Sequence, residues 1–262
     1  MKLTMHPIIF LWSHPRSMST ATERIMRERG DLECLHEPFL HYYYLQKSKQ
    51  NLAHFNDKPG HPVSYQDTRN WILERANSGP VFAKDMSYYV MPELLDDADF
   101  CENVRHCFLI RHPLKSILSY YKLDPGLSLE EIGLQAQWDH FQGIEKLNST
   151  PIVLEAEAIQ SDARAVMRLF WENLGLDYRE QAFDWSNKSM PDDWQYVKGW
   201  HANVSSSAGI EAFSQANEDR AKFEFAQICR EAPHLQTYLD AHLPSYQALK
   251  ARSLSAATVD IG

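Results

Sequence analysis

Short apolar runs that give way abruptly to polar residues recur along the chain. The first is typical, because the apolar segment that ends at Trp12 is followed at once by SHPRSMST. The runs are continuous rather than alternating, a pattern typical of strands that are buried on both faces of a parallel sheet. We predict five strands, at residues 8–13, 32–35, 81–83, 104–110 and 152–154.

Helical stretches separate these strands. A helix is predicted from Ser17 to Arg29 and ends at Gly30; another begins at Pro113, whose ring suits a first helical turn. A third is predicted over residues 163–173. Strands that alternate with helices indicate an α/β fold in which helices cover both faces of a parallel sheet. We therefore predict a single three-layer domain over residues 1–262, with a frayed tail from about residue 253.

Composition narrows the class of protein. The formal net charge of −9 over 262 residues disfavours nucleic acid as the partner, because that ligand requires a broad basic surface. No apolar stretch reaches the roughly 20 residues of a membrane span, and the start does not resemble a signal peptide. The four cysteines lack C-x-x-C spacing, so neither a zinc site nor a disulfide framework is predicted. These features favour a soluble, cytoplasmic protein.

The loop after the first strand has the features of an anion site. It leads directly into a predicted helix, whose N-terminal N–H groups attract anions. Arg16 adds a forked positive charge, and the hydroxyls of Ser17, Ser19 and Thr20 can donate to an oxyanion. The alternative is that a serine merely caps the helix while Arg16 is solvated. The loop lacks the G-x-x-x-x-G-K-[ST] pattern that binds ATP or GTP.

A second strand-turn-helix segment supports the interpretation of the first as an anion site. Arg111 follows strand 104–110, Pro113 opens the next helix, and Ser119 lies six residues further on, which completes the pattern R-x-P-x-x-x-x-x-S. Together with the loop HPRSMSTATE, this pattern resembles the sulfotransferases that use 3′-phosphoadenosine 5′-phosphosulfate (PAPS), and more narrowly a bacterial and plant branch of that family. The resemblance implies a P-loop-like sulfotransferase fold, with PAPS as co-substrate and no metal.

The resemblance also implies ligand contacts. In that family the first loop holds the 5′-phosphosulfate and the second element grips the 3′-phosphate. The expected 5′-phosphosulfate contacts are Arg16, Ser17, Met18, Ser19 and Thr20, and the expected 3′-phosphate contacts are Arg111 and Ser119. Met18 stands where many members have glycine. The long irregular segment 185–209 lies where family members close over the nucleotide, and its expected contacts are Lys198, Trp200 and His201.

Two positively charged side chains that could take part in catalysis, Arg16 and Lys84, follow predicted strands. Sulfuryl transfer builds negative charge on the leaving oxygen, and Arg16 is suited to stabilise that charge. Lys84, after strand 81–83, resembles a family lysine that contacts the transferring group. Its alternative role is a surface ion pair with Asp85 or another carboxylate.

The general base is expected to be a carboxylate. The small-molecule branch of the family has a histidine two residues after the strand-end lysine, but here that position is Met86. Glu37, in HEPF, matches the catalytic glutamate of carbohydrate-modifying sulfotransferases, so we expect Glu37 to be the base, with His36 in reserve. The alternative is that Glu37 orders its loop or pairs with Arg16.

The predicted function is transfer of a sulfuryl group from PAPS to a hydroxyl or amine of a small metabolite. Two alternatives remain: a P-loop-like small-molecule kinase, and a nucleotide-binding protein that has lost catalysis. The missing Walker lysine and the presence of Arg111 with Ser119 disfavour the kinase. Tyrosines at positions 42–44 and 88–89 suit an acceptor pocket or the core, and we favour the core.

Overall fold

Five parallel strands form a single sheet in the order β2-β3-β1-β4-β5. The strands are β1 (Ile8–Ser13), β2 (Glu33–His36), β3 (Val81–Met86), β4 (Val104–Ile110) and β5 (Ile152–Glu155). This is a computed structural model, and it describes residues 6–48, 56, 58–147, 149–186, 189–200, 209–210 and 212–254, without the side chains of residues 197–200. The five strands and their parallel arrangement confirm the α/β prediction.

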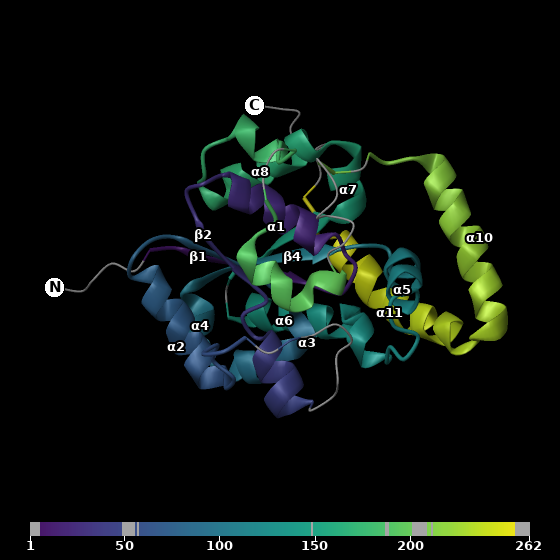
Figure 1. Cartoon of the computed structure of the whole chain (residues 1–262), viewed down its shortest axis with the longest axis horizontal. Helices are drawn as coiled ribbons and strands as arrows, with labels where there is room; N and C mark the ends of the chain where they lie inside the picture. Colours follow the sequence, from purple (N-terminus) through teal and green to yellow (C-terminus); the bar gives the residue numbers. More distant parts are fainter. Residues whose placement is uncertain are drawn as a thin grey trace.

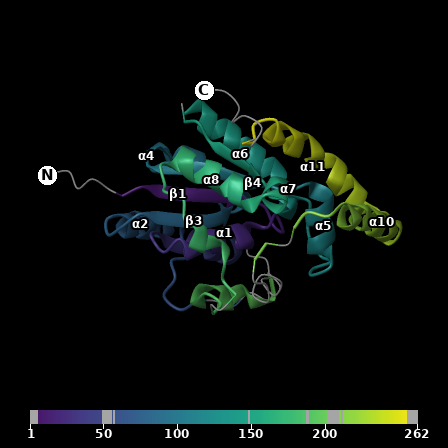
Figure 2. The same cartoon turned by 90° about the horizontal axis from the view of Figure 1, so that it is seen from above.

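Helices cover both faces of the sheet (Figure 1). One face carries α1 (Ser19–Glu28), α7 (Ala156–Ser161) and α8 (Ala163–Leu174). The other carries α2 (Tyr65–Ala76), α3 (Ser87–Val90), α4 (Ala98–Glu102) and α6 (Leu134–Lys146). The remaining helices are α5 (Pro113–Tyr121), α10 (Gln215–Glu231) and α11 (His234–Lys250), and Figures 1 and 2 both show α10 at the edge of the molecule, outside α5 and α11.

The central strand β1 divides its side chains between two cores. Ile9 and Leu11 pack in a cluster with residues of α1 and α8. Ile8, Phe10 and Trp12 point to the opposite face and join the cluster with α2, α3 and α6. Side chains alternate along a strand, and all of these are at most 1% exposed, so β1 is buried on both faces as its continuous apolar run predicts.

Two predicted boundaries are wrong by two residues or more. β3 continues to Met86 instead of ending at residue 83, because the polar residues Lys84 and Asp85 are fully buried among internal partners. α1 begins at Ser19 rather than Ser17, because Met18 adopts the left-handed conformation. Leu254 donates its N–H to the carbonyl of Val153 at 2.8 Å, and residues 255–262 lie outside the described part, so the predicted tail stays a prediction.

The strand order creates a switch point between β1 and β4. The next two strands in the chain, β2 and β3, lie on one side of β1, whereas β4 and β5 lie on the other. At such a point the loops that follow the two neighbouring strands diverge, and the carboxyl edge of the sheet opens a crevice where ligands of α/β proteins bind. The loop after β1 and the turn after β4 are the two predicted anion-binding elements, so the topology places them together.

Strand β4, the neighbour of β1, provides a test of this packing. We expect Phe108→Ala to lower the free energy of unfolding by about 3–5 kcal/mol, because the ring is fully buried and the substitution leaves a cavity. Phe223→Ala in α10 is the control, because its ring is 65% exposed, and it should change stability by less than about 0.5 kcal/mol. Urea denaturation of both variants measures the difference, and equal losses would contradict the assigned core.

Candidate active site

The two predicted anion-binding turns are joined by hydrogen bonds. Arg16 donates from Nε to Ser119 Oγ at 3.0 Å, and Arg111 donates from Nη1 to the backbone oxygen of Arg16 at 2.9 Å. Arg16 and Ser119 are 103 residues apart in the sequence. The structure therefore brings together three side chains that sequence patterns place in separate motifs.

His14 fixes the second turn against the first. Its Nε2 accepts the backbone N–H of Arg111 at 3.1 Å, so this nitrogen carries no proton. Burial, together with the nearby charges of His242 and Arg111, lowers the pKa of His14 to about 3. The imidazole is therefore a neutral acceptor at pH 7. Sequence reasoning did not select His14, because its role depends on a strand that lies 97 residues away.

The first loop is held in a conformation that most residues avoid. Arg16 and Met18 have φ values of 62° and 69°, in the left-handed region. This explains why glycine suits the position of Met18 in many sulfotransferases. Among the described residues Ser17 Oγ is buried and has no hydrogen-bond partner, so Ser17 does not cap α1. An oxyanion at the start of α1 would satisfy that hydroxyl, and in this respect the loop fits the predicted ligand.

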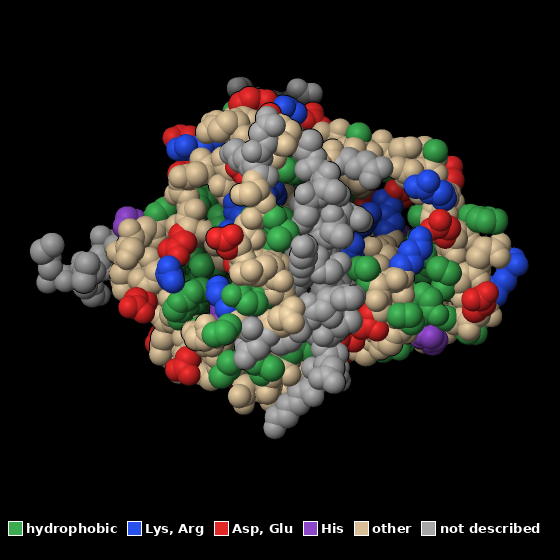
Figure 3. Space-filling model, viewed as in Figure 1, with side chains coloured by type: hydrophobic (Ala, Val, Ile, Leu, Met, Phe, Trp, Pro, Cys, Tyr) green, Lys and Arg blue, Asp and Glu red, His purple; other side chains and the backbone are tan. Residues whose placement is uncertain are grey.

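Positive charge is concentrated at the junction of the two turns. Burial lowers the pKa of Arg16 to about 10, and the charge of Arg111 contributes to the shift. Arg16 stays protonated at pH 7, so two guanidinium groups repel each other in a partly buried position. An anion between them would relieve that repulsion. Figure 3 shows Lys and Arg side chains recessed in a hollow on the face that Figure 1 views.

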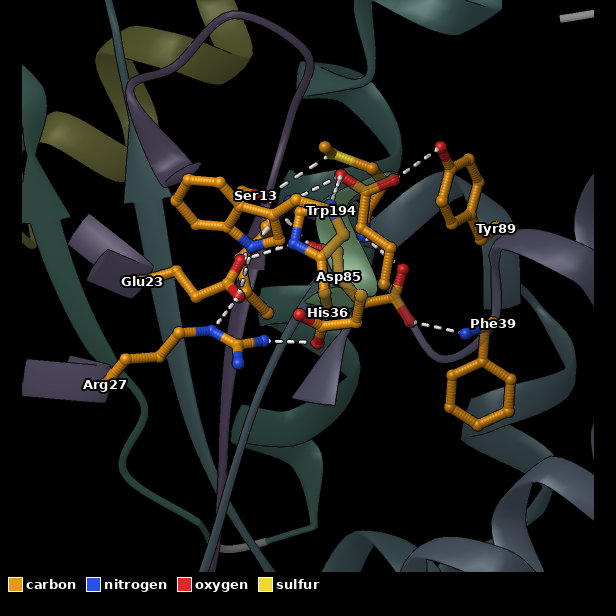
Figure 4. Close-up of polar contacts among 12 residues, drawn as sticks. Ser13, Glu23, Arg27, His36, Phe39, Asp85, Tyr89 and Trp194 are labelled. Atoms are coloured by element: carbon orange, nitrogen blue, oxygen red, sulfur yellow. Dashed lines mark hydrogen bonds and ion pairs between the residues drawn. The ribbon is translucent and has the colours of Figure 1, made fainter. Parts of the chain in front are cut away.

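A second polar cluster lies at the ends of β2 and β3 (Figure 4). Lys84 is fully buried and forms an ion pair with Glu37 Oε1. Tyr89 donates its hydroxyl to Glu37 Oε2 at 3.4 Å, and Glu37 has a φ of 43°. The alternative of an ion pair with another carboxylate fits Lys84 in its partner, Glu37, but the pair lies in the interior rather than at the surface. In the described structure the carboxylate of Glu37 contacts Lys84 and Tyr89.

Asp85 has a structural role in the same region. Its carboxylate accepts the backbone N–H groups of Phe39 at 2.8 Å and of Met86 at 2.9 Å. Burial raises its pKa well above the usual value, with Glu37 as a further cause. Met86 is buried, and Ser13 Oγ contacts its sulfur at 3.3 Å. The position of the family histidine is therefore part of the core.

Three polar side chains contact the buried carboxylate of Glu23 in α1. Its Oε1 accepts from Arg27 Nε at 2.7 Å and from Trp194 Nε1 at 3.0 Å, and its Oε2 lies 2.6 Å from His36 Nδ1. Lys84 Nζ is 3.9 Å from Oε2. The side chain of His36 is 2% exposed, so the reserve base is buried beside Glu23. Sequence reasoning missed Glu23 and Trp194, because helix α1 alone does not show which of its polar residues face inward.

The late segment docks on this cluster through η5 (Asp192–Trp200). Asp193 forms an ion pair with Arg27, and the rings of Trp194 and His36 lie 5.8 Å apart. Lys198 and Trp200 belong to η5, but their side chains lie outside the described part, as does the whole of His201. Their predicted contacts with the nucleotide stay predictions.

The tyrosines near the site are packed side chains. Four of them, Tyr43, Tyr44, Tyr88 and Tyr89, are at most 3% exposed, and their rings contact one another. They belong to the core cluster, as the sequence favours. The hydroxyl of Tyr89 reaches Glu37.

A parallel sheet with two strand-turn-helix elements joined at its switch point is the architecture of a P-loop-like α/β protein. The chain belongs to the sulfotransferase family, because residues 7–253 match the sulfotransferase domain. This confirms the resemblance inferred from the two motifs.

Individual relatives are distant. The chain is 24% identical over 209 residues to branched-chain-amino-acid aminotransferase-like protein 2 of Arabidopsis thaliana, and 24% identical over 217 residues to protein 1 of the same name. Each match covers 78% of this chain but 36% of the relative, so the chain spans about a third of the length of these curated relatives.

Solved sulfotransferase structures are also similar. The sulfotransferase domain from the curacin biosynthetic pathway is 13% identical, with a TM-score of 0.46 over 74% of this chain and 83% of that domain. Sulfotransferase STF9 from Mycobacterium avium is 13% identical, with a TM-score of 0.40 over 87% of this chain and 76% of that structure.

In the described part of the chain, none of the helices has the length and apolar composition of a membrane span.

The buried His14 predicts a pH dependence of stability. Its pKa is about 3 in the folded state and near 6.5 when unfolded, so below pH 6.5 the unfolded chain binds the proton first and stability falls. His14→Gln keeps an acceptor for Arg111 but does not titrate. Between pH 6 and 4, we expect the free energy of unfolding of His14→Gln to fall by about 1.4 kcal/mol less per pH unit than that of the wild type.

Urea denaturation across this pH range measures the two slopes. His234→Gln is the matched control, because His234 is exposed at the start of α11, and it should leave the slope unchanged. If His14→Gln had the wild-type slope, His14 would not be a buried neutral acceptor.

Proposed function

We propose that the protein transfers a sulfuryl group from PAPS to a hydroxyl or amine of a small metabolite. The observation that carries this proposal is the hydrogen-bonded junction of Arg16, Arg111 and Ser119 at the switch point of the sheet. PAPS carries anionic groups at both its 5′ and 3′ positions, and ATP lacks the 3′-phosphate. Two anion-binding turns side by side suit the nucleotide with two separate anionic groups.

The residues of the first turn supply fixed positive charge. In the proposed reaction the acceptor atom bonds to sulfur as the bond from sulfur to the bridging phosphate oxygen breaks, and the nucleotide leaves as 3′-phosphoadenosine 5′-phosphate. Arg16 and the N-terminus of α1 stabilise the negative charge that grows on the bridging oxygen. The hydroxyls of Ser17, Ser19 and Thr20 orient the same group.

The Glu37–Lys84 pair handles the proton. Glu37 lies directly after β2 at the carboxyl edge of the sheet, and it takes the proton that the acceptor loses. Lys84 holds Oε1 of Glu37, and Tyr89 approaches Oε2. These two contacts fix the carboxylate in a buried place, where a left-handed backbone keeps it at the end of the strand.

Nucleotide binding tests the assignment of the second turn. We expect 3′-phosphoadenosine 5′-phosphate to bind without added magnesium and more tightly than adenosine 5′-phosphate. Arg111→Ala should cost about 2–4 kcal/mol of binding free energy, which is roughly a 30- to 700-fold rise in Kd, because a charge-assisted contact to phosphate is lost. Arg105→Ala is the control, because Arg105 is an exposed cation on the same strand.

Isothermal titration calorimetry with both nucleotides, ATP and GTP separates the alternatives. Equal affinity for the nucleotides with and without the 3′-phosphate would overturn the roles of Arg111 and Ser119. Tighter binding of ATP with magnesium, together with phosphate transfer, would support a kinase. Nucleotide binding without transfer to any component of a metabolite extract would support a binding protein.

Glu37→Gln tests the general base. The amide keeps the size of the side chain but cannot accept a proton, so turnover should fall by about 100-fold or more. The assay follows labelled sulfuryl groups from PAPS into a metabolite extract. Glu33→Gln is the control, because Glu33 lies on the same strand in an exposed ion pair with Arg75, and it should keep its turnover. Unchanged turnover with lost stability in Glu37→Gln would make Glu37 a structural loop anchor.

A further inference from the structure

Glu23 is a buried charged group that the proposed reaction does not use. It is fully buried in α1, one turn after the predicted anion-binding loop, and it is the last residue of the HPRSMSTATE segment, which by itself assigned it no role. A carboxylate in such a place is costly unless donors surround it, and Glu23 has Arg27, Trp194 and His36 as hydrogen-bond partners. His36, the third of these partners, also lies beside Glu37 of the Glu37–Lys84 pair.

The hydrogen bonds determine where the proton of His36 lies. Glu23 Oε1 already accepts two hydrogen bonds, one from the guanidinium of Arg27, and these stabilise the ionised carboxylate. The 2.6 Å contact between Oε2 and His36 Nδ1 then requires the proton to be on Nδ1. A neutral ring with that proton has its lone pair on Nε2. This nitrogen lies 3.8 Å from Glu37 Oε1.

The charges around His36 favour the neutral ring. They come from α1 (Glu23 and Arg27), from the loop after β2 (Glu37), from β3 (Lys84) and from η5 (Asp193). Arg27 pairs with Asp193, and Lys84 pairs with Glu37, so the anions other than Glu23 already have cationic partners. Burial lowers the pKa of His36 to about 3, and Lys84 is the next cause.

We infer that Glu23 is a positioning residue that acts through the Nδ1 proton of His36 and keeps an imidazole N–H away from Glu37. With the other tautomer, an N–H on Nε2 would point toward Glu37 Oε1 at 3.8 Å, and its partial positive charge would stabilise the ionised carboxylate and weaken Glu37 as a base. The inference rests on the proposed role of Glu37. It also explains why Trp194 of η5 reaches into the cluster, since its N–H donates to Oε1 of Glu23, the oxygen that does not contact His36.

Two amide substitutions separate a positioning role from a catalytic one. His36→Asn places an amide nitrogen near the position of Nδ1, keeps the donation to Glu23, and lacks Nε2. His36→Gln reaches the position of Nε2 and lacks the donor to Glu23. We expect His36→Asn to keep turnover within about 5-fold of wild type and His36→Gln to lose roughly 10- to 100-fold in kcat with little change in KM for PAPS, as for other groups that orient a reacting residue.

Turnover alone decides between the two roles. An equal loss in both variants would make His36 a base that acts through Nε2 and would overturn the inference. Unchanged turnover in both would also overturn it, because the bond to Glu23 would then have no effect on the reaction. Retained turnover in His36→Gln with a loss in His36→Asn contradicts it as well.

Nitrogen-15 NMR of histidine-labelled protein tests the tautomer independently of any activity. The His36 signals are identified by their absence in His36→Asn. We expect wild-type His36 at pH 7 to be neutral with its proton on Nδ1, and Glu23→Gln to raise the population of the Nε2 tautomer. Glu28→Gln, in the same helix but paired with Arg24, is the control and should leave the His36 signals unchanged.

A proton on Nε2 in the wild type would overturn the inference whatever reaction the protein carries out. Failure of the proposed function gives a different result: the wild type would transfer no sulfuryl group, while the NMR signals would still report whether Glu23 fixes the Nδ1 proton of His36.

Discussion

The parallel pairing of β1 with β4 is the constraint on which the candidate site depends. In this ladder Ile8 lies opposite Val104 and Trp12 lies opposite Phe108, so both strands reach the carboxyl edge of the sheet at the same level. The loop that carries Arg16 and the turn that carries Arg111 then leave the sheet side by side. Their mutual hydrogen bonds follow from that register, and a shift of one residue would also move the buried side chains of both strands to the wrong faces.

Backbone strain is concentrated at the same edge. Among the described residues other than glycine, positive φ values occur at Arg16, Met18 and Glu37, in the loops after β1 and β2. Such conformations cost roughly 1–3 kcal/mol each and persist only where the surrounding structure fixes them. Here the two cores on either side of a fully buried β1 provide that support. The strained residues are those proposed to contact the sulfuryl donor or to accept a proton, so the fold holds unfavourable conformations where chemistry requires fixed groups.

Much of the fold could be predicted from the sequence, because continuous apolar runs identify strands of a parallel sheet. The order of the strands could not, since no local pattern shows that β1 lies between β3 and β4. Local chemistry likewise identified the residues at strand ends, including Arg16, Glu37 and Lys84. Contacts that join distant segments were missed: Glu23 and Trp194 are 171 residues apart, and the side chain of Trp194 meets the carboxylate only after η5 has docked. A polar residue at a strand end suggests solvent, whereas Lys84 is buried because Glu37 compensates its charge.

Helix α1 connects the two halves of the candidate site. Its first residue, Ser19, follows the anion-binding loop, and Glu23 lies about 6 Å further along the helix axis, at a rise of about 1.5 Å per residue. The N-terminus faces the place proposed for the leaving oxygen, and Glu23 reaches the cluster around Glu37. Proton transfer and stabilisation of the leaving group must act on the same transition state, so their separation has to be fixed within a fraction of an ångström. A buried helix that carries both its N-terminus and Glu23, the residue inferred to position His36 beside Glu37, holds the two halves in register more firmly than two loops would.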